Sequence, residues 1–274
     1  ENNTSVGRTA LSSNTTANDN TAVGSNALAS NTTGTANVAI GRVALDANTT
    51  ASNNTAVGYG SLTDNTTGYA NVAAGKNSLA NNTTGYHNVS IGADSLETNT
   101  TGHSNTAVGE SALLANTDAD NNVAIGMDAL KANTTANSNT AVGSAAMLAN
   151  TTGTQNVAVG RSALDANTTA SNNTTVGYES MTSNTTGADN CAFGASALAS
   201  NTTGGDNNAF GKQAMTANTT GSSNTAMGHA SLDANTTASN NTAFGAASLS
   251  ANTTGVDNTC LLYTSPSPRD RTRS

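Results

Sequence analysis

Residues 122–138 read NVAIGMDALKANTTANS, and the chain on both sides repeats this unit with the same spacing. The glycine of the unit, Gly126, recurs every seventeen residues from Gly7 to Gly245 without an insertion or deletion, and is termed the marker glycine. Solenoids have strict periods of this kind because each coil stacks only on its neighbours. The sequence therefore predicts one long stack of about fifteen coils, and its constant spacing argues against disorder.

Two columns of the aligned repeats are apolar. The residue before the marker glycine is apolar throughout, as at Ile125, and the residue four positions after it is Leu or Met, as at Leu130. We predict that these two columns form the core. The residue four positions before the marker glycine is always Asn, from Asn3 to Asn241. Such a column can form amide ladders between stacked coils.

Each repeat divides into three parts. The segment Asn-(Thr/Val)-Ala-(Val/Ile)-Gly alternates as a β-strand does. The segment after it, such as residues 25–29, could be a second short strand or one helical turn. The Asn-Thr-Thr-(Gly/Ala) segment predicts a turn. We therefore predict an all-β fold over residues 1–259, a parallel β-solenoid or β-roll about 70 Å long at the usual strand spacing.

Small residues occupy three further columns. The marker glycine is never replaced by Ala, which indicates a positive φ or a backbone approach too close for a methyl group. Gly and Ala alternate after Asn-Thr-Thr, as at Gly34 and Ala51, which indicates a need for small size. The columns two before and three after the marker glycine hold only Ala, Ser or Thr, as at Ala124 and Ala129. These last two columns either face another chain or turn inward in a narrow coil.

The repeat resembles known surface proteins. Residues 37–41 and 122–126, with the core Asn-x-Ala-(Val/Ile)-Gly, resemble the head repeats of trimeric autotransporter adhesins. The whole unit is also similar to repeats of bacterial and phage tail-fibre-type proteins. The resemblance covers residues 2 to about 259. It implies a parallel β-roll, a homotrimer or filament, and a role in surface attachment, and it favours the interpretation that the small columns face another chain.

Composition argues against several classes of function. The chain has 17 acidic and 9 basic residues, and only 9% of its residues are charged. Such a balance disfavours nucleic acid, which requires clustered Lys and Arg. The acidic residues lack the glycine-aspartate period of calcium-binding β-rolls. His87, His103 and His229 occupy different columns, and no catalytic arrangement can be assembled from them. We expect no enzyme activity, metal or cofactor.

Asn-Thr-Thr is an N-glycosylation sequon as well as a turn sequence. In one repeat Asp118 replaces the second Thr and removes the sequon. The turn role and a glycan-coated fibre remain alternatives, and covalent N-glycans are therefore possible partners. The fourteen acceptor residues are Asn14, Asn31, Asn48, Asn65, Asn82, Asn99, Asn133, Asn150, Asn167, Asn184, Asn201, Asn218, Asn235 and Asn252.

The end of the chain departs from the pattern. Leu262 stands at the next marker position, and residues 260–274 contain both prolines and three Arg. We interpret residues 260–274 as a tail that is not native. Cys191 and Cys260 lie four coils apart, roughly 19 Å, which is too far for a disulfide.

The sequence predicts a non-enzymatic structural protein. No apolar run is long enough to span a membrane. We expect an extracellular fibre or adhesin-like protein at a cell or virion surface, which could be a glycoprotein. A phage tail-fibre shaft is one alternative. An ice-binding or other ligand-binding solenoid is the other, although Val replaces Thr at several strand positions, such as Val38 and Val123.

Overall fold

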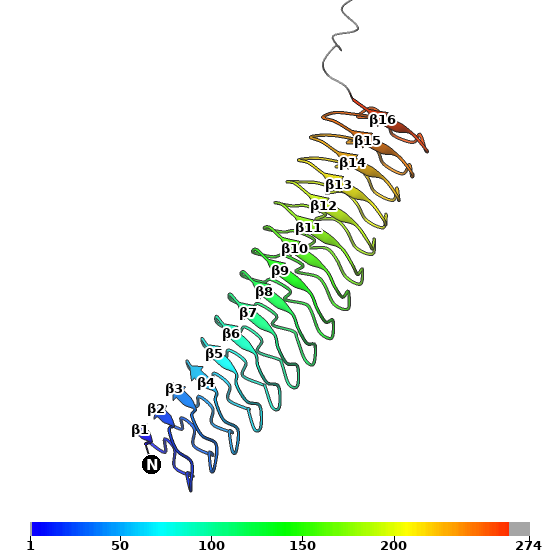
Figure 1. Ribbon diagram of the computed structural model, residues 1–274. Helices are drawn as coiled ribbons and strands as arrows, with labels where there is room; N and C mark the ends of the chain where they lie inside the picture. Colours follow the sequence, from blue (N-terminus) through cyan, green and yellow to red (C-terminus); the bar gives the residue numbers. More distant parts are fainter. Residues whose placement is uncertain (1, 263–274) are drawn as a thin grey trace, which may run out of the picture.

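The chain forms one rod of stacked coils (Figure 1). The computed structural model describes residues 2–262, and within this range all regular secondary structure is β. Sixteen short strands lie in chain order in a single parallel sheet. The strands are β1 (Thr4–Val6), β2 (Thr21–Val23), β3 (Val38–Ile40), β4 (Thr55–Val57), β5 (Val72–Ala74), β6 (Val89–Ile91), β7 (Thr106–Val108), β8 (Val123–Ile125), β9 (Thr140–Val142), β10 (Val157–Val159), β11 (Thr174–Val176), β12 (Cys191–Phe193), β13 (Asn208–Phe210), β14 (Thr225–Met227), β15 (Thr242–Phe244) and β16 (Thr259–Leu261). The predicted parallel β-solenoid of about fifteen coils is confirmed, and its last strand ends at Leu261, two residues beyond the predicted boundary.

The register of the sheet follows the sequence period. Val123 of β8 pairs with Thr106 of β7 and with Thr140 of β9, each seventeen residues away. The backbone N–H of Val123 donates to the carbonyl of Asn139 at 2.8 Å, and the N–H of Gly126 donates to the carbonyl of Val108 at 2.7 Å. Each coil is therefore bonded to the coil before it and the coil after it, which explains why the repeat length does not vary.

The segment after the marker glycine is neither a strand nor a helical turn. The residues two and four positions after Gly126, which are Asp128 and Leu130, have positive φ values of 60° and 51°. Their N–H groups point to opposite neighbours: Asp128 donates to the carbonyl of Glu110, and Leu130 to that of Ala146, both at 3.0 Å. The backbone groups of this segment are thus paired between coils, although it has no regular conformation.

The core is narrow and consists mainly of Ala and Leu. Ala124, Ala129 and Leu130 are completely buried. Equivalent residues in the other coils stack on them and form one continuous cluster along the rod. The small columns therefore turn inward within a single chain, and our preference for an interface with another chain at these positions is not supported.

The apolar column before the marker glycine lies outside the core, so its prediction as core is wrong. Ile125 is 40% exposed and Phe244 is 46% exposed, whereas Ala124 is 0% exposed. Strand residues alternate between two faces, so only one column of each pair can point inward. The Leu column fills much of the coil, so small residues such as Ala124 lie inside and the larger residues lie outside.

Both reasons considered for the marker glycine apply. Gly126 has a φ of +134°, and a methyl group at its Cα would lie 2.6 Å from the carbonyl oxygen of Gly143 in the next coil. The Gly/Ala column after Asn-Thr-Thr has no positive φ among the described residues, as at Gly34. Small size is therefore the requirement there, as predicted.

Two Asn columns form ladders with different chemistry. In the column four positions before the marker glycine, the Oδ1 of Asn122 accepts from the backbone N–H of Asn139 at 2.9 Å. The Nδ2 of Asn122 donates to the carbonyl of Ala136 at 2.9 Å. A side-chain amide ladder runs instead through the Asn-Thr-Thr column, where the Nδ2 of Asn150 donates to the Oδ1 of Asn133 at 3.0 Å. Both columns are buried and hydrogen-bonded, as buried polar groups generally are.

Candidate interaction face

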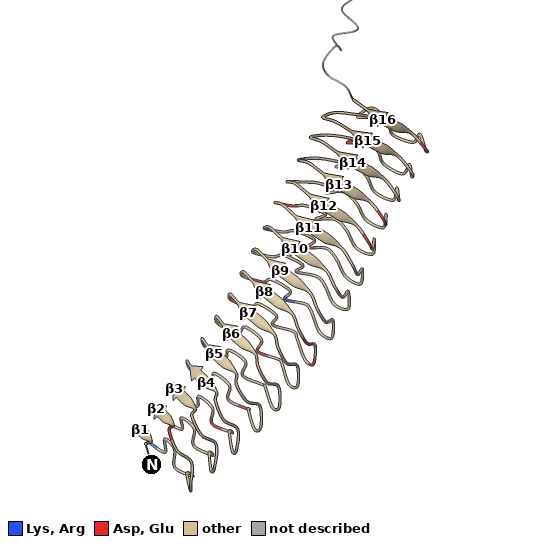
Figure 2. Cartoon of the chain, viewed as in Figure 1, with Lys and Arg blue, Asp and Glu red and all other residues tan. Residues whose placement is uncertain are grey.

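The outward side of the sheet is a uniform surface that runs along the rod. The first and third residues of strands β1–β16 point outward and form a surface that we term the sheet face. None of these residues is charged. Lys, Arg, Asp and Glu lie on the connecting segments at the two sides of the strands (Figure 2). The sheet face is therefore a neutral strip bordered by charged positions.

Thr, Val and Ile dominate the sheet face. The first residue of each strand is Thr or Val except at Cys191 and Asn208, and the third residue is apolar in every strand. Most of these side chains are half-buried, because their stacked neighbours cover their flanks, and several third residues are more exposed. Aligned β-branched side chains of this kind pack well on a pleated surface.

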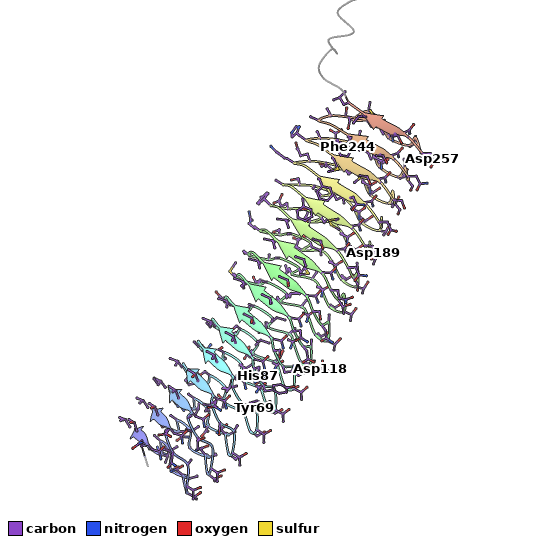
Figure 3. The ribbon with its side chains drawn as sticks, viewed as in Figure 1. Tyr69, His87, Asp118, Asp189, Phe244 and Asp257 are labelled. Carbon is purple, nitrogen blue, oxygen red and sulfur yellow. The ribbon has the colours of Figure 1, made fainter. Side chains whose placement is uncertain are left out.

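The sheet face becomes bulkier toward β16. Phe193 and Phe210 stack with their ring centroids 5.2 Å apart and their planes 5° apart. Met227, Phe244 and Leu261 continue the same column, and Phe244, the last residue of β15, is labelled in Figure 3. This end of the sheet face therefore presents larger apolar groups than the Val- and Ile-rich remainder.

An aromatic row lies beside the sheet on three successive coils. The rings of Tyr69 and Tyr86 stack at 5.1 Å, and those of Tyr86 and His103 at 4.6 Å. The Nε2 of His103 lies 3.2 Å from a carboxylate oxygen of Asp120. His87 packs edge-on against both tyrosines, and it lies one coil from Tyr69 (Figure 3). The rings stack along the rod axis, so the row stabilises the contact between adjacent coils.

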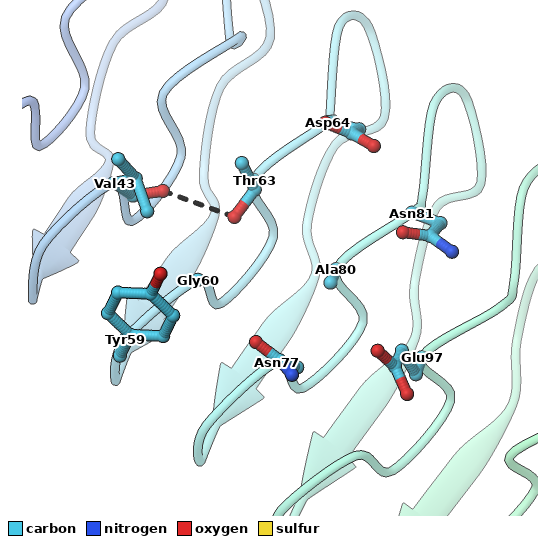
Figure 4. A pocket seen from close by; sticks show the side chains of 9 residues that line it. All are labelled: Val43, Tyr59, Gly60, Thr63, Asp64, Asn77, Ala80, Asn81 and Glu97. Carbon is cyan, nitrogen blue, oxygen red and sulfur yellow. Dashed lines mark hydrogen bonds between the residues drawn. The ribbon is translucent and has the colours of Figure 1, made fainter.

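A shallow groove lies at Gly60, which has no side chain where the neighbouring coils have Val43 and Asn77. The groove has a volume of about 270 Å³ and is open to solvent. Figure 4 shows Tyr59, Asp64 and Glu97 around it, and the Oγ1 of Thr63 donates to the carbonyl of Val43 at 3.2 Å. The carboxylates of Asp64 and Glu97 come from different coils. The groove therefore offers no enclosed site for chemistry.

The predicted glycan acceptors lie inside the coils. Twelve of the fourteen sequon Asn side chains are buried, and only Asn14 and Asn252, near the ends, are partly exposed. The Nδ2 of Asn133 donates to the Oδ1 of Asn116 at 3.3 Å and to the carbonyl of Ala136 at 3.0 Å. A glycan on this Nδ2 would replace one of these hydrogen bonds and would need space that the coil does not have. The geometry favours the turn role of Asn-Thr-Thr within folded coils.

The remaining site expectations concern Cys, metal ligands and the tail. Cys191 and Cys260 are free, and burial raises the pKa of the Cys191 thiol. Among residues 2–262, no group of three or more His, Cys, Asp or Glu side chains is placed to hold a metal ion. The same range contains no helix long and apolar enough for a membrane span. Residues 263–274 of the predicted tail lie outside the described residues.

Comparison with known proteins adds no family to these observations. No protein-family model matches the chain, and no curated protein matches it significantly.

Sequence reasoning missed the sheet face because it assigned the apolar column to the core. The signal was present in the columns: Ala is nearly constant at the middle strand position, whereas the third position varies from Ala to Phe. Such tolerance of size indicates an outward position.

Proposed function

We propose that the protein is a non-enzymatic structural rod of an extracellular fibre or an adhesin-like surface protein. The observation that supports this proposal is the unbroken stack of strands β1–β16, in which every coil is bonded to its neighbours with the same register. Such an object is stiff along its axis and extends by adding coils. A shaft of a phage tail fibre has the same physical requirements, and the cell or virion surface is the proposed location.

Electron microscopy of the purified chain, together with immunogold labelling of the source, tests this proposal. We expect uniform straight rods about 70 Å long for sixteen strands at the usual spacing. Gold particles should lie on the outside of cells or virions. Labelling confined to the cell interior would overturn the proposed function even if the rods were present.

A second candidate function follows from the regularity of the sheet face. Its first column presents Thr or Val at nearly every strand, at a constant spacing of about 4.8 Å. A rigid array of hydroxyl and methyl groups could order water, as an ice-binding surface must. A thermal hysteresis assay with an outward Thr106→Tyr variant as control tests this function. Equal freezing behaviour of the wild-type protein and a buffer control would remove it.

A further inference from the structure

We propose that the sheet face is a self-association surface on which a second copy of this chain packs face to face, forming a dimer. This inference rests on the proposed structural role and names the partner and the surface that the role would use. Self-association was expected as a homotrimer or filament through the small columns, but residues such as Ala124 are buried within the chain. The surface must therefore lie elsewhere.

The area of the sheet face matches what a stable dimer needs. Sixteen strands at about 4.8 Å spacing, each about 10 Å long, give roughly 700 Å² per copy. Two copies face to face would bury about 1,400 Å², which lies within the range of stable protein interfaces, about 1,200–2,000 Å².

The charge distribution favours a copy of the same chain over a charged partner. The sheet face has no charged side chain, so pairing would bury no ion. Leaving out Asp270 and the three Arg at positions 269–273, the chain has sixteen acidic and six basic residues, and those of the described range lie on the connecting segments. Asp118, Asp189 and Asp257 lie at the edge of the rod, away from the strand arrows (Figure 3). In a face-to-face pair these like charges stay at the outer edges, where solvent screens them.

The geometry of the sheet makes it complementary to itself. All sixteen strands pair parallel with the same seventeen-residue register, so the outward columns of neighbouring coils stay aligned along the rod. Two sheets can pack about 10 Å apart with their side chains interdigitating. A two-fold axis uses the same patch on both copies, so the contact closes after two chains. One sheet face per chain therefore leads to a dimer, whereas a closed trimer would need a second contact surface.

Light scattering on the full chain tests the proposal with two matched variants. Ile125 lies on the sheet face, and Met127, two residues later, is exposed beyond the marker glycine. We expect wild-type protein and Met127→Glu to have twice the chain mass of 26.9 kDa at micromolar concentration. Ile125→Glu should raise the dimer dissociation constant about a hundredfold or more, because each copy buries an unpaired charge. Circular dichroism should show that all three proteins keep their β-structure.

Cys191 provides an independent probe of the same surface. It is the first residue of β12 and lies half-buried on the sheet face. In a Cys260→Ser background, maleimide labelling of Cys191 should slow as protein concentration rises. The rate should become independent of concentration after Ile125→Glu is added.

Three results would overturn the dimer: a wild-type monomer at all concentrations, a trimeric mass, or an Ile125→Glu protein that dimerises as tightly as Met127→Glu. Straight rods of monomeric mass on the surface of the source would remove this inference and leave the proposed structural role intact. Dimers found only inside the cell would support the self-association surface and overturn the proposed role at a cell or virion surface.

Discussion

At the scale of single residues, each coil contains conformations that L-amino acids usually avoid. Asp128, Leu130 and Ser138 of one coil all have φ between 51° and 62°. A left-handed non-glycine residue costs about 1–2 kcal/mol. The backbone around these residues is hydrogen-bonded to both neighbouring coils, and these bonds offset the cost of the left-handed conformations. An isolated coil would lose the bonds and keep the cost. The conformation of a coil is therefore stable only within the stack.

The marker glycine gives the first prediction. Gly126→Val should lower the free energy of unfolding by more than about 3 kcal/mol, because a branched side chain meets both a positive φ and the Gly143 carbonyl. Met127→Val, at the exposed neighbouring position, should change it by less than about 0.5 kcal/mol. Thermal melts followed by circular dichroism measure both. A similar loss in the two variants would contradict the column assignment.

A left-handed position gives a prediction with two opposite outcomes. The column five residues before the marker glycine has positive φ, and Asn or Asp occupies eight of its fifteen positions. These residues tolerate left-handed conformations best after glycine. At Ala36, which is exposed with φ 56°, replacement by Asn should raise the stability by about 0.5 kcal/mol, and replacement by Val should lower it by about 1 kcal/mol. Urea unfolding can resolve the order of the three proteins.

At the scale of elements, the Asn-Thr-Thr turn depends on its Asn and much less on its second Thr. Asn133→Ala removes the donor to the Oδ1 of Asn116 and the acceptor of the Nδ2 of Asn150. Buried polar groups without partners cost about 1–3 kcal/mol each. Thr135 is exposed, so Thr135→Ala should be nearly neutral in unglycosylated protein, although it removes the same sequon. Equal effects of the two variants on the melting temperature would argue against the ladder.

The same ladder predicts where glycans can occur if the source is a eukaryote. Interior acceptors such as Asn99, Asn133 and Asn150 have buried side chains, whereas Asn252 is partly exposed. We expect glycopeptide mass spectrometry to find higher occupancy at Asn252 than at the interior sites. Asn116 should carry no glycan because it lacks the sequon. Full occupancy of the interior sites on folded rods would be incompatible with these buried amides.

At the scale of the whole molecule, the stack behaves as a one-dimensional object in which only nearest neighbours interact. Strand β8 contacts β7 and β9, and the same relation holds along the rod. The coils should therefore be interchangeable as complete units. Deletion of only part of a unit would place the residues that follow beside non-equivalent residues of the preceding coil.

Deletion of a whole coil tests this behaviour. Removing residues 122–138 joins Asn121 to Asn139 and preserves every column, so a folded rod about 4.8 Å shorter should result. Removing only residues 123–138 leaves one extra residue, which breaks the register at one point. We expect this second protein to lose at least about 3 kcal/mol of stability or to melt in two steps. Calorimetry distinguishes these outcomes, and equal melting of the two deletions would contradict strict stacking.

The architecture of this protein could be predicted from its amino-acid sequence. A seventeen-residue period without insertions predicts parallel in-register stacking, because every residue must lie beside its equivalent in the next coil. The invariance of Gly126 and the alternation of Gly and Ala after Asn-Thr-Thr also indicate that these two columns have different backbone requirements. Each of these features can be recognised from a single position of the aligned repeats.

The assignment of columns to the inside or the outside of the coil required the three-dimensional path of the chain. Strand alternation allows either Ala124 or Ile125 to point inward, and hydrophobicity favoured the wrong one. The left-handed residues Asp128 and Leu130 return the chain close to the strand and bring Leu130 opposite Ala124 in a narrow coil. The inward strand position holds Ala, Ser or Thr, as at buried Ala124, Ser90 and Thr175, whereas the larger Ile side chain lies outside. The path of the backbone therefore set the size of the core, and the size of the core placed Ile125 on the outer face.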